Sequence, residues 1–205
     1  MNPTPAVSVS AAVEGVVDEA VIRKLIQETG ASVGAVYGRK GKPHLRQRIS
    51  AYNQAARRNP WVVLVDLDRD PDCAPVLRTA WIPIPARLMC FRVAVREVEA
   101  WLLADSEGLA RFLGIPQARI PTDPESLVSP KETMIGLARL SRRNEIRDDI
   151  VPCPRSGRQI GPAYTSRMTE FVNRLWRPEV AQRSSESLRR CRLRIQEMIH
   201  LMVQK

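Results

Sequence analysis

The sequence has few of the residues that form zinc sites or disulfide frameworks. It contains four cysteines, no two of which form a CxxC pair, and two histidines. The cysteines are Cys73, Cys90, Cys153 and Cys191, and the histidines are His44 and His200. This spacing argues against zinc and against stabilising disulfides, and a reducing cytoplasm is the expected setting.

Long apolar stretches are also missing. No run approaches the length of a membrane-spanning helix, and residues 1–9 lack the basic start and apolar stretch of a signal peptide. We therefore expect no membrane association. Aromatic residues make up only 5% of the chain, which argues against surfaces that stack the bases of single strands.

Positive charge is in clear excess. The 205 residues include 32 Lys and Arg against 22 Asp and Glu, which gives a formal net charge of +10. This charge favours a polyanionic partner, DNA or RNA, although a basic composition can also serve solubility alone. A hydrophobic content of 44% is enough for a buried core.

The first half of the chain alternates between strand-like and helix-like segments. Residues 61–65 (WVVLV) are a continuous apolar run rich in β-branched valine, which is typical of a buried strand in a parallel sheet. Strands are expected at 7–13, 33–37, 61–65 and 89–95, and helices at 16–28, 45–58 and 98–113. The last of these ranges is one helix or two, and Ser106 or Asp105 is expected to cap the second. This alternation predicts an α/β fold, an open and mostly parallel sheet flanked by helices.

The character of the chain changes after Gly114. Residues 115–130 form a proline-rich connection, and helices are expected at 131–141, 163–176 and 185–203. We expect a core at 7–113 and a C-terminal helical extension at 114–205 packed on it. The last helix has an apolar stripe beside four arginines, Arg189, Arg190, Arg192 and Arg194. Core packing with a basic outer face is favoured over a helix dedicated to nucleic acid.

Acidic residues follow two of the expected strands. Glu14 follows the first, and Asp66 and Asp68 follow the third. Ligands of open parallel sheets bind at the carboxyl ends of the strands, and hard cations such as Mg²⁺ prefer carboxylate oxygens. The same residues are also common turn formers, so the pattern by itself leaves both roles open.

These motifs resemble the TOPRIM superfamily over residues 7–113. Its pattern is Glu-Gly after the first strand, here Glu14-Gly15, and Asp-x-Asp after the third, here Asp66-Leu67-Asp68. The chain is similar to nucleases of the overcoming-lysogenisation-defect (OLD) type and to small stand-alone proteins of the RloB group, which carry a further Glu-x-Trp, here Glu99-Ala100-Trp101.

The resemblance implies a role for each of these carboxylates. Glu14 would be a metal ligand or the general acid/base, Asp66 and Asp68 would be metal ligands, and Glu99 would complete the site. Glu97 lies two residues from Glu99, so on one helix the two side chains would point to nearly opposite sides and only Glu99 would face the cleft. Trp101 is expected in the core.

Two loops supply cations. Arg39, Lys40 and Lys42 lie in a glycine-rich loop before a helix start, where backbone amides favour phosphate. The loop is not a Walker A motif, because Val36 and Pro43 replace the glycine and the hydroxyl residue that the motif needs. Lys42 is the main candidate for a phosphate contact, with a solvated turn as the alternative.

The second cationic loop contains Arg155 and Arg158, which are expected to contact the phosphates of a nucleic-acid substrate. OLD-type nucleases have a basic residue near their metals, so the resemblance implies that Lys131 or Arg158 assists catalysis, and the sequence does not choose between them.

The leading hypothesis is therefore a nuclease that uses Mg²⁺ or Mn²⁺ to hydrolyse nucleic-acid phosphodiesters. The resemblance implies the effector of a bacterial defence or toxin system, controlled by an ATPase partner. The alternative is a non-catalytic TOPRIM-like module that docks on an ATPase or on nucleic acid. The sequence leaves open the DNA or RNA target, the number of metals and the oligomeric state.

Overall fold

A four-stranded parallel sheet forms the centre of the first half of the chain. The computed structural model describes residues 7–68 and 73–204. The strands are β1 (Ser8–Val13), β2 (Ser32–Gly38), β3 (Trp61–Asp66) and β4 (Met89–Ala94), in the order β2-β1-β3-β4. The predicted open, parallel α/β sheet is confirmed.

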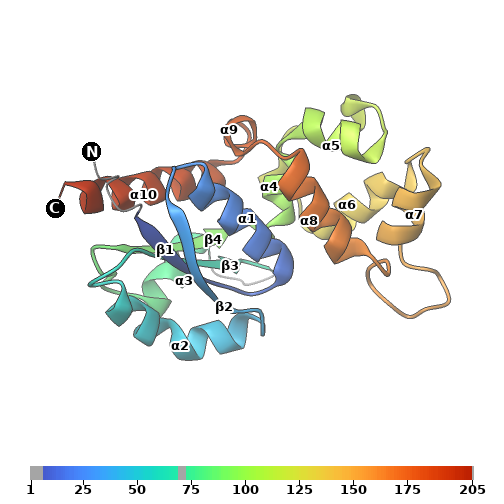
Figure 1. The fold of residues 1–205 in the computed structure, drawn as a ribbon. Coiled ribbons are helices and arrows are strands. Elements are labelled where there is room, and N and C mark those ends of the chain that lie inside the picture. The colour runs from blue at the N-terminus through green and yellow to red at the C-terminus, as the bar shows by residue number, and fades with distance from the viewer. Residues whose placement is uncertain (1–6, 69–72, 205) are drawn as a thin grey trace. The chain divides into compact units, whose positions relative to one another are not determined.

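Helices cover both faces of this sheet (Figure 1). They are α1 (Val16–Gln27), α2 (Lys42–Ala55) and α3 (Ala74–Trp81), together with the C-terminal helix α10 (Glu186–Val203). All six residues of β3 are buried, and alternate ones, Trp61, Val63 and Val65, share a core with residues of α2 and α3. By the two-residue period of a strand, the side chains between them face α1 and α10.

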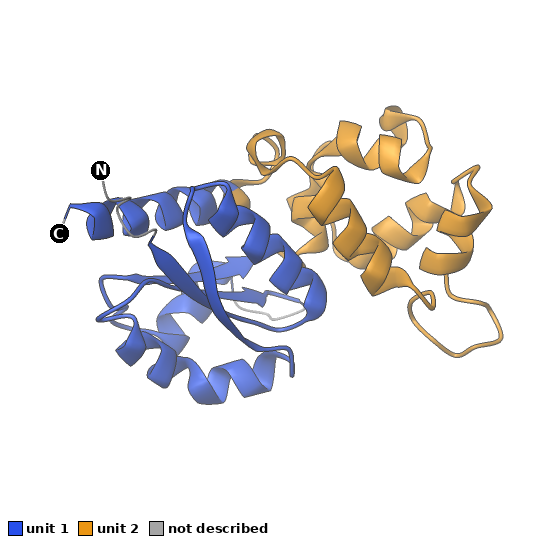
Figure 2. Ribbon diagram, viewed as in Figure 1, with its two compact units in different colours: residues 1–94, 189–205 blue, residues 95–188 orange. Residues whose placement is uncertain are grey.

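The chain divides into two compact units, shown in Figure 2. Unit 1 comprises residues 1–94 and 189–205, and unit 2 comprises residues 95–188. This division differs from the expected boundary after Leu113, because residues 95–113 belong to unit 2 and most of the last helix belongs to unit 1 with the sheet. Cys191, Ile195 and Met198 are fully buried there. Arg192 pairs with Glu28 beyond α1, so the basic side of the helix is not wholly exposed as predicted.

Unit 2 is helical apart from its loops. Its helices are α4 (Glu99–Leu103), α5 (Ser106–Leu113), α6 (Pro130–Arg139), α7 (Asn144–Ile150), α8 (Tyr164–Arg174) and α9 (Pro178–Ala181), with short 3₁₀ turns at η1 (Gln117–Arg119) and η2 (Pro124–Ser126). The short helices α7 and α9 were not predicted. None of the helices among residues 7–68 and 73–204 is long and apolar enough to cross a membrane.

Two helix details in unit 2 test the sequence predictions. Trp101 is fully buried, as predicted, and its indole N–H donates to Ser187 Oγ at 2.7 Å. Of the two residues predicted to cap α5, Asp105 is confirmed and Ser106 is wrong: Asp105 holds the cap position and its carboxylate accepts from the Gly108 N–H at 3.0 Å. Asp105 is buried and the guanidinium of Arg177 pairs with it at 2.6 Å, so this cap is fixed more firmly than a serine hydroxyl could be.

The loop between β2 and α2 depends on Gly38. Gly38 has φ of 96°, a region that favours glycine, and a Cβ at this position would collide with the carbonyl oxygen of Val13. That carbonyl accepts from the Arg39 N–H at 2.8 Å, and the Glu14 carbonyl accepts from the Gly41 N–H at 3.2 Å. The basic loop is thereby joined to the end of β1.

Replacing Gly38 with alanine should lower the free energy of unfolding by about 3 kcal/mol or more, because the positive φ and the backbone collision add. The matched control is Gly136→Ala, at an exposed position of α6 where an added Cβ meets nothing within 4 Å. It should raise stability by about 0.5–1 kcal/mol. Urea denaturation measures both, and a loss below about 1 kcal/mol at Gly38 would contradict the conformational argument.

Candidate metal centre

The carboxyl ends of β1 and β3 bring Glu14 and Asp66 together. The two strands are adjacent, with Val13 paired to Leu64 in the register. The Asp66 N–H donates to Glu14 Oε1 at 2.8 Å. In the order β2-β1-β3-β4 the chain leaves β1 and β3 in opposite directions, so the site lies at the switch point where open α/β sheets bind ligands.

Lys42 ties the next turn to the same place. Its ammonium donates to the carbonyl oxygens of Asp66 at 2.7 Å and Leu67 at 3.2 Å, and to Asp68 Oδ2 at 3.2 Å. Lys42 is the first residue of α2, so the positive end of that helix lies beside the carboxylates. Asp68 has φ of 56° in the left-handed region, which a short Asp tolerates better than most residues.

Burial makes the charge on Glu14 costly. The pKa of Glu14 is raised to about 7 from an ordinary value of 4.5, mainly because burial desolvates the carboxylate and also because of the nearby charges of Asp18 and Asp68. The hydrogen bond from Asp66 and the charge of Lys42 oppose that rise. Asp18 itself is buried on α1, and Gly15 leaves it room, since a Cβ there would come within 3.0 Å of Asp18 Oδ2.

The carboxylates at this site suit an ion held by one or two protein ligands and water better than an ion held by three or more side chains. Among the residues that the structure describes, no group of three or more His, Cys, Asp or Glu side chains is placed to hold a metal ion. Mg²⁺ is commonly bound through one or two carboxylates, with water and substrate phosphate as its other ligands. Glu14 accepts a hydrogen bond from the backbone N–H of Asp66, which places two carboxylate-bearing residues at the same edge of the sheet, and Asp68 lies close enough to raise the pKa of Glu14. These residues are compatible with that smaller requirement.

Arg39 and Lys40, the other two cations of the basic loop, have different surroundings from Lys42. Arg39 pairs with Glu19 on α1 at 3.3 Å, and Glu19 also binds Arg23 at 2.8 Å. Lys40 is exposed. Of this loop's three cations predicted to contact phosphate, Arg39 and Lys42 are therefore held by acidic or carbonyl groups, and Lys40 offers an exposed ammonium.

A second group of predicted residues gathers within unit 2. Glu99 is buried, its Oε1 accepts from the Tyr164 hydroxyl at 3.0 Å, and the Lys131 ammonium lies 3.5 Å from it. Lys131 also lies 3.9 Å from Glu97 Oε1, and its backbone N–H donates to Glu97 Oε2 at 2.8 Å. Tyr164 was not predicted from the sequence as a member of this group; it lies 65 residues after Glu99 in the chain.

The prediction that Glu97 and Glu99 face opposite sides is wrong. Helix α4 begins at Glu99, so Glu97 lies before the helix and helical spacing does not separate the two side chains. Both carboxylates share Lys131 instead. Lys131, one of the cations proposed to assist catalysis, therefore lies beside the carboxylates of Glu97 and Glu99.

Arg155 and Arg158 lie in the connection between α7 and α8, where both are exposed. The convergence of Glu99, Lys131 or Arg158 with the carboxylates of unit 1 stays a prediction, since each unit is described by itself.

Comparison with known proteins gives one structural likeness. No family model and no curated protein matches the chain. Among solved structures, the C-terminal region of the Burkholderia pseudomallei OLD protein is similar with a TM-score of 0.47 and 15% sequence identity, covering 93% of this chain and 98% of that one. At this TM-score and identity, the likeness does not assign the chain to a family.

The raised pKa of Glu14 predicts a stability difference that depends on pH. The folded state binds the Glu14 proton more tightly than the unfolded state, so the stabilising contribution is complete below the unfolded pKa of 4.5 and is lost as the pH rises through about 7. Glu14→Gln stays neutral and can still accept from Asp66. In metal-free buffer the variant should match the wild type near pH 4 and exceed its stability by about 3 kcal/mol at pH 8.

The control is Glu132→Gln, at an exposed position of α6, which should show no such pH dependence. Denaturation curves across this pH range provide the measurement. An equal or lower stability of Glu14→Gln at pH 8 would show that the buried carboxylate is not disfavoured.

Proposed function

We propose that this protein is a metal-dependent nuclease that hydrolyses nucleic-acid phosphodiesters with Mg²⁺ or Mn²⁺. The observation that carries the proposal is the contact between Glu14 and Asp66 at the ends of two adjacent parallel strands. The formal net charge of +10 supports a polyanionic substrate. Glu14, Asp66 and Asp68 would hold the metal, which activates a water and neutralises phosphate oxygens when bound.

The residues of unit 1 then have separate roles. Glu14 would serve as a metal ligand or as the general acid/base that exchanges a proton with the attacking water. Lys42 fixes the Asp66–Asp68 turn through its three contacts. Lys40 and the N-terminus of α2 provide positive potential for the phosphate beside the carboxylates.

A non-catalytic binding module is the second candidate, and a specific observation favours it. The Lys42 ammonium already neutralises Asp68 and occupies the Asp66 and Leu67 carbonyl oxygens. A lysine in this position competes with a metal for the same oxygens. In that case the positive charge of the chain would serve binding, and the carboxylates would serve only the local fold.

The partner and the biological role belong to the same proposal. On the resemblance of the motifs alone, we propose control by an ATPase and a place in a bacterial defence or toxin system. An unregulated nuclease would attack the nucleic acid of its own cell, so a controlling partner is physically reasonable.

The cleavage assay uses plasmid DNA, single-stranded DNA and tRNA, each with Mg²⁺, Mn²⁺ or EDTA. Wild type should cleave at least one substrate with metal and none with EDTA. Asp66→Asn should reduce the rate by at least about 100-fold, because it removes a charged ligand while keeping the side-chain shape. Asp148→Asn, at an exposed position of α7, is the control and should cleave like wild type.

Two results would count against the nuclease. Equal cleavage by wild type and Asp66→Asn would assign the activity to a contaminant. Binding of nucleic acid by both proteins, with no cleavage under any condition, would favour the binding module.

A further inference from the structure

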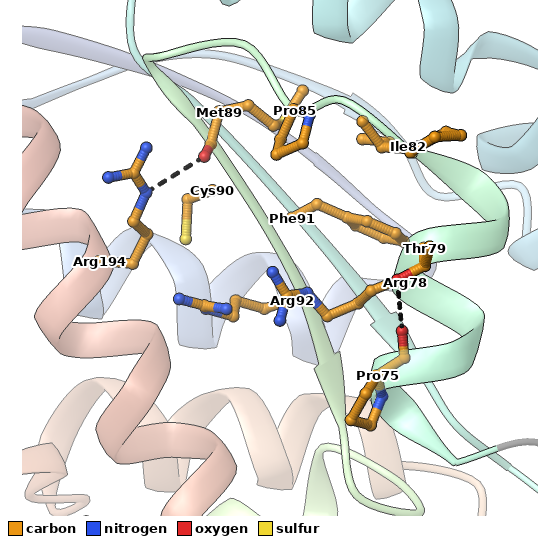
Figure 3. Close-up of a pocket in the computed structure, with 11 residues that line it drawn as sticks. Pro75, Arg78, Thr79, Ile82, Pro85, Met89, Cys90, Phe91, Arg92 and Arg194 are labelled. Carbon is orange, nitrogen blue, oxygen red and sulfur yellow. Dashed lines mark hydrogen bonds between the residues drawn. The ribbon is translucent and has the colours of Figure 1, made fainter.

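A cavity of about 320 Å³ lies at the outer edge of β4, away from the carboxylate turns. Strand β4 is the last strand in the sheet order, and the cavity is formed between it, α3 and α10 (Figure 3). Arg78 comes from α3, Arg92 from β4 and Arg194 from α10. All of the residues that line it belong to unit 1.

The charged side chains that line this cavity are positive. Three arginines and no acidic residue are among the described residues that line it. Burial lowers the pKa of Arg78, and the positive charges of Arg92, Arg190 and Arg194 lower it further. Like charges held this close repel one another in a partly desolvated site, and a bound anion would relieve that repulsion.

Two of the arginines have hydrogen-bonding capacity that the fold does not use. The Nε atoms of Arg78 and Arg92 are buried and have no hydrogen-bond partner in the described part of the chain. Leaving a buried donor unsatisfied costs about 1–3 kcal/mol. Arg194 differs, because it donates to the carbonyl oxygens of Arg87 at 2.6 Å and Met89 at 3.3 Å, which fixes one wall of the cavity.

The remaining walls are apolar. Pro75, Ile82, Pro85 and Phe91 contribute to them, and the Phe91 ring stacks on Trp81 with centroids 5.5 Å apart. A cavity near 320 Å³ is at the lower end of the range for small-molecule sites and is too small for a nucleic-acid duplex. Arginines on one side and apolar groups on the other suit a ligand with a phosphoryl group and a compact organic part.

We propose that this cavity binds a small organic phosphate of about the size of a nucleoside monophosphate. The arginines would hold the phosphoryl oxygens, and the proline and phenylalanine side chains would pack against the organic part. The proposal does not depend on the nuclease function, since no residue of the carboxylate site takes part.

A purely structural role is the competing explanation. Charged side chains on an edge strand prevent it from pairing with another molecule. If the arginines serve only this purpose, their removal should cause self-association and should not affect the binding of any phosphate.

The test is calorimetric titration in metal-free buffer with AMP, ADP, inorganic phosphate and a short single-stranded oligonucleotide. Wild type should bind AMP or ADP saturably and more tightly than inorganic phosphate. Arg78→Gln and Arg92→Gln should each weaken binding by at least about tenfold. Arg58→Gln removes the same charge at an exposed position of unit 1 and should stay within about twofold of wild type.

A second measurement needs no variant that must fold. In methyl NMR spectra of wild type, the nucleotide should shift the resonances of Met89 and Ile82, which line the cavity, and leave Met134 of unit 2 unchanged. Absence of saturable nucleotide binding, or shifts without Met89 and Ile82, would overturn the proposal. Binding of the oligonucleotide alone would also overturn it and would assign the arginines to a nucleic-acid strand.

Asp66→Asn separates the two proposals. It should bind nucleotide like wild type even if it abolishes cleavage, because Asp66 does not line the cavity.

Discussion

The hydrogen bond from the Asp66 N–H to the Glu14 carboxylate is the contact on which the candidate site depends. It joins the ends of two parallel strands that are 52 residues apart in sequence and adjacent in the sheet. Lys42 adds contacts to Asp66, Leu67 and Asp68 on one side, and Gly41 binds the Glu14 carbonyl on the other. The Asp66–Asp68 turn is therefore fixed by the Lys42 side chain, and the end of β1 by a backbone N–H of the basic loop.

Burial of the Glu14 carboxylate has an electrostatic cost, and this cost bears on the function of the site. A carboxylate whose pKa is raised to about 7 by burial contributes less to folding at neutral pH than an exposed one would. Structures retain such costs mainly where a function needs them. A divalent cation would reverse the balance, because its charge favours the ionised forms of Glu14, Asp66 and Asp68 together.

The sheet and its carboxylates could be predicted because their signals are local. The valine-rich apolar run at 61–65 and the acidic residues that follow β1 and β3 identify the elements and their ends. The sequence predicted that these carboxylates lie at the carboxyl ends of parallel strands, but the adjacency of β1 and β3 is known only from the strand order of the structure. The contacts of Lys42 with the Asp66 and Leu67 carbonyls were beyond prediction, because they are made to backbone oxygens and not to a motif.

Other features could not be predicted because they are non-local. The return of α10 to the sheet depends on Cys191, Ile195 and Met198 finding a buried position about 100 residues after β4. The arginine cavity joins Arg78, Arg92 and Arg194, which share no sequence pattern. Glu97 and Glu99 were misplaced because the start of α4 falls between them, and helix boundaries are the least certain part of any sequence-based assignment.

Metal binding by the carboxylate site is the central claim, and Mn²⁺ titration followed by electron paramagnetic resonance tests it most directly. Wild type should bind Mn²⁺ saturably at neutral pH, and Mg²⁺ should compete. The double variant Glu14→Gln/Asp66→Asn should bind at least about tenfold more weakly while remaining folded. Equal Mn²⁺ affinity in the two proteins, or no saturable binding by the wild type, would contradict the account.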